Sequence, residues 1–251
     1  MAKPAKTDRK AVIEEMRKKQ KSADRRRGTV IVTVCVVAAL GIIAAAVVPI
    51  LLDKREDSKL DGVALDKIGS AASVCAKITT KPADGNQEHV PVDTPVDYAD
   101  APPAFGSHWN EAGVAPASFS RKFYTGDDRP ALEALVHNLE HGYTILWYDA
   151  TIAKDSKALD EIEAISRKFG SDSDFRDKFI AAPWKSSDED GAKLPDGKHV
   201  AFTHWSAGGN GETDTTKQVG VFQYCSGVSG AALSTFMDKY PYTDSPEPNA
   251  M

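Results

Sequence analysis

The sequence predicts an α/β or α+β domain, in which a sheet is backed by helices, tethered by a single N-terminal transmembrane helix. Three observations predict it. Residues 29–52 are uncharged and almost wholly apolar. From Asp128 onwards, segments with the periodicity of helices and of strands follow one another. Beyond the apolar run the chain has two cysteines, Cys75 and Cys225, as expected for an exported domain with one disulfide.

The apolar run at residues 29–52 is long enough to cross a membrane. At about 1.5 Å per residue, its 24 residues exceed the roughly 30 Å of a bilayer core. The core of a cleaved signal peptide is usually only about 7–15 residues long. We therefore favour an uncleaved anchor in the cytoplasmic membrane, although cleavage near Ala44–Ala46 stays open.

The charges on the two sides of this run predict its orientation. Residues 1–28 hold eleven Lys and Arg but only four Asp and Glu. Positive flanks stay in the cytoplasm, so we expect the N-terminus inside and residues 53–251 outside. The basic tail suits anionic lipid headgroups, and we favour a mostly disordered arm over a short amphipathic helix at residues 11–21. The membrane is thus one expected partner.

The negative charge of the residues after position 28 argues against nucleic acid as a partner. Residues after position 28 hold 20 of the 31 basic and 32 of the 36 acidic side chains, a net charge of −12. An acidic surface argues against a nucleic-acid partner. Composition also suggests domain limits: residues 53–80 are expected to form a juxtamembrane stalk, and residues 81–251 an extracytoplasmic domain long enough to bury a core.

The first helix of this domain is expected near residue 128. Asp127 or Asp128 would cap its start, with Pro130 in the first turn and Gly142 at its end. Its apolar stripe consists of Leu132, Leu135, Val136 and Leu139.

The remaining elements follow in regular order. Short runs rich in β-branched and aromatic residues predict strands, and one-sided apolar spacing predicts helices. The expected order is a strand at 143–148, a helix at 154–169, strands at 179–183, 199–205 and 218–224, and a helix at 229–240. This order is typical of a sheet backed by helices, with its connectivity left open.

Cys75 and Cys225 are expected to form a disulfide, because cysteines outside the cytoplasm are usually oxidised. Closing a loop of about 150 residues stabilises a fold by up to about 5 kcal/mol in the chain-entropy account. No CxxC motif accompanies the pair, which favours a structural bridge over a redox pair.

The candidate chemistry lies in the histidines. His137 and His141 flank Glu140, and two histidines four positions apart on a helix share a face and can chelate one ion. His89 and His108 lie in loops able to fold over the helix end. Imidazole and carboxylate ligands without a thiolate favour Zn²⁺ or Cu²⁺. The candidate metal ligands are therefore His89, His108, His137, Glu140 and His141.

Two other interpretations of this motif stay open. His137 and His141 can simply cap the carboxyl end of the helix, although a carboxylate at Glu140 is disfavoured there by about 0.3–1 kcal/mol unless it is paired. Alternatively, the HxxEH order indicates a metal-dependent hydrolase with Glu140 as general base. Gly142 weakens this alternative because it ends the helix at once. We assign no catalytic residue.

Several of these residues also carry a family resemblance. They are Tyr98, Pro102-Pro103, Gly106-Ser107-His108, His137-Asn-Leu-Glu140-His141-Gly142, Pro183, Trp205, Phe236 and Tyr240. Over residues 85–245 the chain resembles the actinobacterial domain of unknown function 3105. The resemblance implies a membrane-tethered extracytoplasmic domain without an established activity, and it points to the same four histidines and Glu140 as the site.

The sequence thus favours a single-pass envelope protein that is not an enzyme. Its outer domain is expected to bind a partner, such as another envelope or membrane protein, with Zn or Cu as the candidate cofactor.

Overall fold

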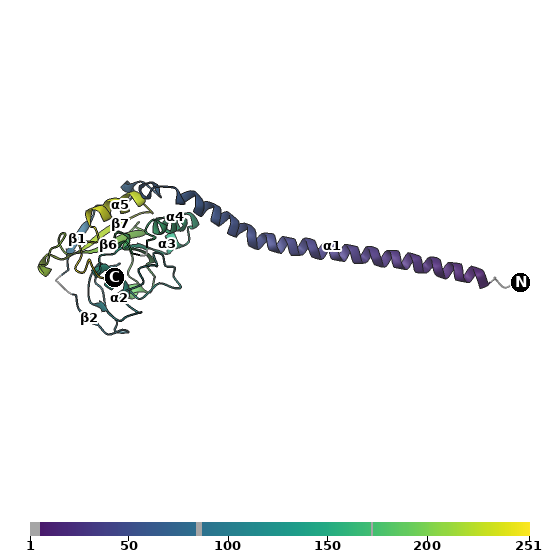
Figure 1. Ribbon diagram of the computed structural model, residues 1–251, viewed down its shortest axis with the longest axis horizontal. Helices are drawn as coiled ribbons and strands as arrows, with labels where there is room; N and C mark the ends of the chain where they lie inside the picture. Colours follow the sequence, from purple (N-terminus) through teal and green to yellow (C-terminus); the bar gives the residue numbers. More distant parts are fainter. Residues whose placement is uncertain (1–5, 84–86, 172) are drawn as a thin grey trace. The chain divides into compact units, whose positions relative to one another are not determined.

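The computed structural model describes residues 6–83, 87–171 and 173–251. Its contacts divide the chain after Glu56 into two compact units. The first consists of the greater part of one helix, and the second contains the sheet and the remaining helices (Figure 1).

Helix α1 (Lys6–Asp61) contains the apolar run. Its stretch Val12–Ala45 is the one candidate membrane-spanning helix among the described residues, with a mean hydropathy of 2.5 and no burial. The helix begins at Lys6, so the expectation of a mostly disordered basic arm was wrong. The physical reason is local: the chain has no glycine or proline between Lys6 and Gly28, and Glu15 pairs with Lys19 one turn later.

The second unit is built on a five-stranded mixed sheet, in the order β1-β7-β6-β4-β5. The pairs β1–β7, β7–β6 and β6–β4 are antiparallel, and the pair β4–β5 is parallel. The bounds are β1 Thr79–Pro82, β4 Thr144–Tyr148, β5 Phe179–Pro183, β6 Val200–Ser206 and β7 Val219–Cys225. The predicted class, a sheet backed by helices, is confirmed.

Helices α4 (Ser156–Arg167) and α5 (Gly230–Lys239) pack on one face of this sheet (Figure 1). The short helix α3 (Ala150–Ala153) precedes α4. Alternate residues of a strand point to opposite faces, so Leu146 of β4 joins this core with Ile162 and Phe236.

Helix α2 (Leu132–Glu140) packs on the opposite face. Its Leu135 and Leu139 meet Trp147 of β4 and Trp205 of β6 in a second core. The segment before α2 adds two short parallel strands, β2 (His89–Val90) and β3 (His108–Trp109), and β3 contacts α2. The pairing of β2 with β3 thus brings residues from the segment before α2 against that helix.

The predicted helices are present with shifted starts. The first begins at Leu132 rather than near residue 128, because the Asp128 carboxylate closes a turn by accepting hydrogen bonds from the backbone and hydroxyl of Thr125. The second begins at Ser156 because the Asp155 side chain caps it there. The four predicted strands, β4 to β7, agree with prediction to within one residue at each end, whereas β1, β2 and β3 were not predicted.

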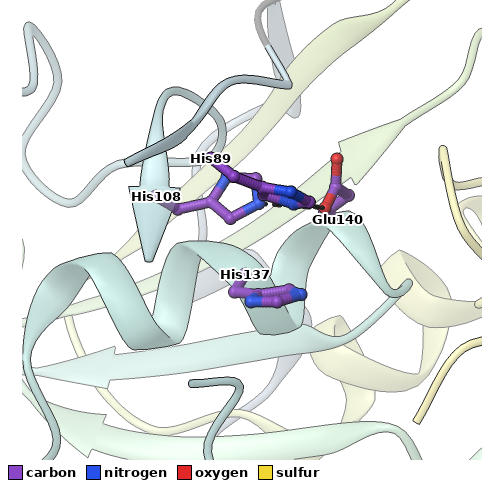
Figure 2. Close-up of side chains that lie close together, drawn as sticks. All are labelled: His89, His108, His137 and Glu140. Atoms are coloured by element: carbon purple, nitrogen blue, oxygen red, sulfur yellow. Dashed lines mark hydrogen bonds and ion pairs between the residues drawn. The ribbon is translucent and has the colours of Figure 1, made fainter. Parts of the chain in front are cut away.

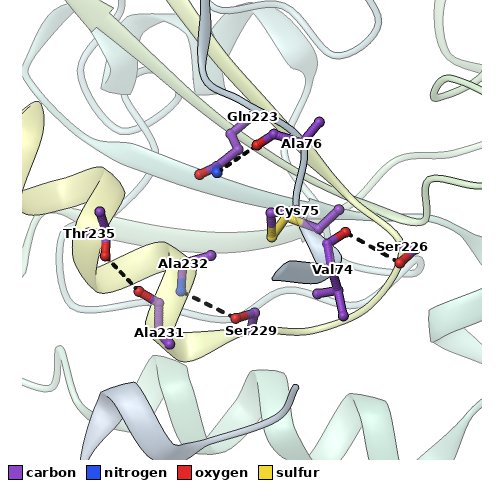
Figure 3. The surroundings of a disulfide bond; sticks show 10 residues. Val74, Cys75, Ala76, Gln223, Ser226, Ser229, Ala231, Ala232 and Thr235 are labelled. Atoms are coloured by element: carbon purple, nitrogen blue, oxygen red, sulfur yellow. Dashed lines mark hydrogen bonds between the residues drawn. A yellow bond between two sulfur atoms is a disulfide. The ribbon is translucent and has the colours of Figure 1, made fainter. Parts of the chain in front are cut away.

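The predicted disulfide between Cys75 and Cys225 is present (Figure 3). Around it the chain before β1 is hydrogen-bonded to β7: the Gln223 amide donates to the carbonyl of Ala76. Residues 57–80, expected as a stalk from their polarity, belong to this unit, because Ile68 is only 1% exposed in its core. In the structure the compact unit thus begins at Asp57 rather than at residue 81.

Candidate metal centre

Four polar side chains converge on the last turns of α2 (Figure 2). His89 and His108 are paired in register on β2 and β3, while His137 and Glu140 come from α2. One potential ligand atom of each lies within 4.8 Å of the others. With metal–ligand bonds of about 2.0–2.2 Å, two ligand atoms of one ion lie at most about 4.4 Å apart. A small inward movement therefore suffices for all four to bind one ion.

Backbone carbonyls fix the hydrogen positions on two of the rings. Nδ1 of His108 lies 2.8 Å from the Gly106 carbonyl oxygen, and Nδ1 of His137 lies 2.6 Å from that of Trp109. A carbonyl oxygen only accepts, so each Nδ1 carries a hydrogen and each neutral ring keeps its lone pair on Nε2. Metal-binding histidines are commonly held in this way.

The Glu140 carboxylate faces these imidazoles. Its Oε2 lies 2.9 Å from Nε2 of His108 and 3.5 Å from Nε2 of His89. Burial by itself raises the pKa of Glu140, but the contacts with His108, Gln87 and His137 outweigh burial and lower the pKa to about 2. At neutral pH the group is therefore an ionised carboxylate, which is the form that binds a metal.

The other carboxylate oxygen is held by a chain of side-chain hydrogen bonds. Gln87 Nε2 donates to Oε1 of Glu140 at 2.8 Å. Gln218 donates to Gln87 at 2.8 Å, and the Trp205 indole donates to Gln218 at 3.1 Å. This chain runs from the main sheet to α2 and orients the carboxylate, so that Oε2 points at the histidines.

Most of the cluster is buried. His108 is 0% exposed, Glu140 1% and His137 2%, whereas the His89 side chain is 40% exposed. Burial, together with the neighbouring His141 and His108, lowers the pKa of His137 to about 4. His137 is therefore neutral at physiological pH, with its Nε2 lone pair available.

His141, the fifth predicted candidate, lies beside this cluster. Its Nε2 is 3.0 Å from Nε2 of His137, and burial lowers its pKa to about 4. It groups with Glu140 and with Glu247 of the C-terminal segment, with potential ligand atoms again within 4.8 Å of one another. The structure thus places four of the five candidates in one group and the fifth next to it.

The two remaining histidines have other surroundings. His199 pairs with Asp149 at 2.9 Å. His204 is fully buried between the backbone carbonyls of Tyr143 and Asp244, at 3.1 and 2.8 Å. Neither belongs to the cluster on α2; His204 is a core histidine with both ring nitrogens hydrogen-bonded, and His199 is a partly exposed member of an ion pair.

Sequence reasoning missed Gln87, Gln218 and Glu247. Neither glutamine belongs to a motif, and the two are 131 positions apart, so the sequence carries no signal for their contact. Glu247 lies near the chain end, and contacts far apart in the sequence bring it to the site, among them its backbone bond to the Glu140 carbonyl at 3.0 Å.

The fold and the site define a class: a mixed α+β domain with a mostly buried histidine–carboxylate cluster where β2 and β3 meet α2. The chain matches the family described as protein of unknown function (DUF3105) over residues 89–251, which is more than half of its length. The chain belongs to this family, and the resemblance found in the sequence is confirmed. No curated protein and no solved structure gives a significant match.

Proposed function

We propose that the second unit is an extracytoplasmic metal-binding module of a single-pass membrane protein, without enzymatic activity. His89, His108, His137 and Glu140 are its ligands for one Zn²⁺ or Cu²⁺ ion. The observation that carries this proposal is the contact between Nε2 of His108 and Oε2 of Glu140 at 2.9 Å.

That contact needs a positive species between its two atoms. His108 donates through Nδ1 to Gly106, so a neutral ring presents only a lone pair to the ionised carboxylate. A proton on Nε2 of His108 would also join the two atoms, as a buried ion pair between His108 and Glu140. A metal ion placed there is also within reach of His89 and His137, which an extra proton does not explain.

The nature of the ligands selects the ion and favours binding over catalysis. Three imidazoles and one carboxylate suit Zn²⁺ or Cu²⁺. Four protein ligands close a tetrahedral zinc site, whereas catalytic sites usually keep a position open. Glu140 stands in a ligand position with its second oxygen held by Gln87, so it is poorly placed as the general base of a hydrolase.

The disulfide supports the extracytoplasmic assignment. Bridges such as Cys75–Cys225 persist in oxidising compartments and are rare in the cytosol. The helix long enough to cross a membrane, with its basic N-terminal flank, agrees with that orientation. A partner in the envelope or the membrane follows from this location, and crosslinking in native envelopes tests it: recovery of the chain alone counts against a partner.

Metal analysis of the full chain, purified in detergent, tests the metal site. We expect bound Zn or Cu in the wild type and its loss in His108→Ala and His137→Ala, with His199→Ala as the matched control that keeps the ion. An X-ray absorption spectrum should show nitrogen and oxygen ligands without sulfur. A metal-free wild type, or an ion retained in both variants, contradicts the proposal.

A further inference from the structure

The Glu140 carboxylate belongs to two groups of potential ligands at once. The first contains His89, His108 and His137, and the second contains His141 and Glu247. We propose that the centre holds two metal ions bridged by Glu140, the second ion being completed by His141 and Glu247. This inference rests on the metal site proposed above.

The distances fit two adjacent ions. Nε2 of His137 and Nε2 of His141 are 3.0 Å apart, and Nε2 of His141 lies 3.5 Å from Oε2 of Glu247. In two-metal sites the ions are about 3.5–4 Å apart. His137 and His141 would then be neighbouring ligands of different ions, on either side of the shared carboxylate.

A single ion with more ligands does not account for the same atoms. Any two ligands of one ion lie within about 4.4 Å of each other. His141 has its 4.8 Å group with Glu140 and Glu247, and not with His89 and His108. Its imidazole is only 5% exposed, and its Nε2 has His137 on one side at 3.0 Å and Glu247 on the other at 3.5 Å.

The C-terminal segment is fastened where it delivers Glu247 to this position. The backbone N–H of Glu247 donates to the Glu140 carbonyl at 3.0 Å. The buried Lys178 ammonium donates to the carbonyls of His141, Pro248 and Ala250, at 2.6, 2.8 and 2.7 Å. The end of α2 and the end of the chain are thereby held together.

The second ion differs from the first in its ligands and in its access. One imidazole and two carboxylates are an oxygen-richer set, which suits Zn²⁺ or Mn²⁺ better than copper. The Glu247 side chain is 45% exposed, while the first ion is surrounded mainly by buried groups. Three protein ligands leave a position for water or for an exogenous ligand. The second ion is therefore the one that exchanges with solvent.

Equilibrium dialysis of the full chain in detergent against buffered free Zn²⁺ tests this inference. We expect two ions per wild-type chain at saturation and one in Glu247→Gln, whose exposed side chain can change without disturbing the core. Glu212→Gln, at a partly exposed glutamate that pairs with Lys217 away from the centre, is the matched control and should retain two ions. X-ray absorption of the wild type should show a second metal at about 3.5–4 Å.

The outcomes separate the two proposals. One ion in the wild type with unchanged affinity in Glu247→Gln overturns the second ion and leaves the first site intact. If the wild type and Glu247→Gln both bind two ions, the second ion lies elsewhere, and this result also overturns the inference. A wild type that binds no zinc here and carries no zinc or copper when purified overturns the metal-binding function itself. Circular dichroism and an intact disulfide establish that Glu247→Gln is folded.

Discussion

Gln87 shows how a residue outside the ligand set can control the centre. Its side-chain amide is the hydrogen-bond donor at Oε1 of Glu140, and Gln218 holds it in place. Outer partners of this kind typically contribute about 10–100-fold to metal affinity.

We therefore expect Gln87→Ala to weaken binding of the first ion by about 10–100-fold while the fold is retained. Competition with a chromogenic chelator measures the change in affinity. Gln223→Ala, at a partly buried glutamine that donates to Ala76 instead, is the matched control. Equal affinities of the wild type and Gln87→Ala would show that the carboxylate needs no orientation.

The titration of the buried histidines predicts how the metal-free chain responds to acid. Burial lowers the pKa of both His137 and His141 to about 4, below the ordinary 6.5. Between these pH values the unfolded chain binds protons that the folded chain does not, so stability rises with pH across this window. The free energy of unfolding should fall as the pH is lowered from about 6.5 to about 4.

Urea denaturation of the chelator-treated protein at several pH values measures this loss. Replacing both histidines by glutamine should flatten the dependence, because glutamine does not titrate. A free energy of unfolding that increases on acidification would mean that the rings are cationic in the folded state. The low pKa of His137 also means that protons compete only weakly with a metal ion for this one ligand above about pH 5.

At the scale of single residues, the sequence predicted that His137, Glu140 and His141 lie close together, because residues three and four positions apart on a helix are neighbours on its surface. It did not predict that His108 and Glu140 would meet at 2.9 Å, since that distance depends on how the segment before α2 folds back. Nor could it separate His141 from the first group, because a four-residue spacing is compatible with one ion or with two.

At the scale of the elements, the position of the C-terminal segment depends on one buried side chain, that of Lys178. Lys178, which directly precedes β5, is 1% exposed, and its three hydrogens are matched by three backbone carbonyls. Burial lowers its pKa to about 8, still high enough for the ammonium to predominate at neutral pH. The positive charge at the carboxyl end of α2 also suits the helix dipole.

We expect Lys178→Met to destabilise the second unit by about 2–4 kcal/mol, because it leaves buried carbonyls without a donor. It should also free the C-terminal segment, making it sensitive to carboxypeptidase. Thermal unfolding and limited digestion measure the two effects. Lys154→Met, at an exposed lysine, is the control. A variant with unchanged stability and a protected C-terminus would show that the segment is held by other contacts.

Strands β4 to β7 were predictable from sequence because local composition decides them: β4 and β5, for example, are short runs of apolar residues with clear ends. Strands β1, β2 and β3 were not, since they are short and depend on pairing with distant segments. The start of α2 was not, because Asp128 had two possible uses and its bond to Thr125 competes with capping the helix. The contribution of residues 57–80 was hidden for a different reason. The buried Ile68, the Cys75–Cys225 disulfide and the pairing of β1 with β7 join a polar segment to the core, and all three depend on distant residues.

At the scale of the whole molecule, a helix long and apolar enough to span a membrane was predictable from length and hydropathy. The proposed side of the membrane for the folded unit rests on flanking charge. The cysteines can report it. Cys35 is a free thiol in α1, and Cys75 and Cys225 form the disulfide. Cysteine pairs are oxidised to disulfides outside the cytoplasm and stay reduced as thiols within it.

Cells lysed under acid-quenched, denaturing conditions and treated with a thiol-reactive mass tag should therefore yield a chain with one tag. The same chain reduced before tagging should carry three, the total number of its cysteines. In Cys35→Ser the unreduced chain should carry none, which assigns the single tag to the anchor. Three tags without reduction would place Cys75 and Cys225 in a reducing compartment. The proposed orientation would then fail, and the metal centre would face the cytosol, where free zinc and copper are kept scarce by competing thiols.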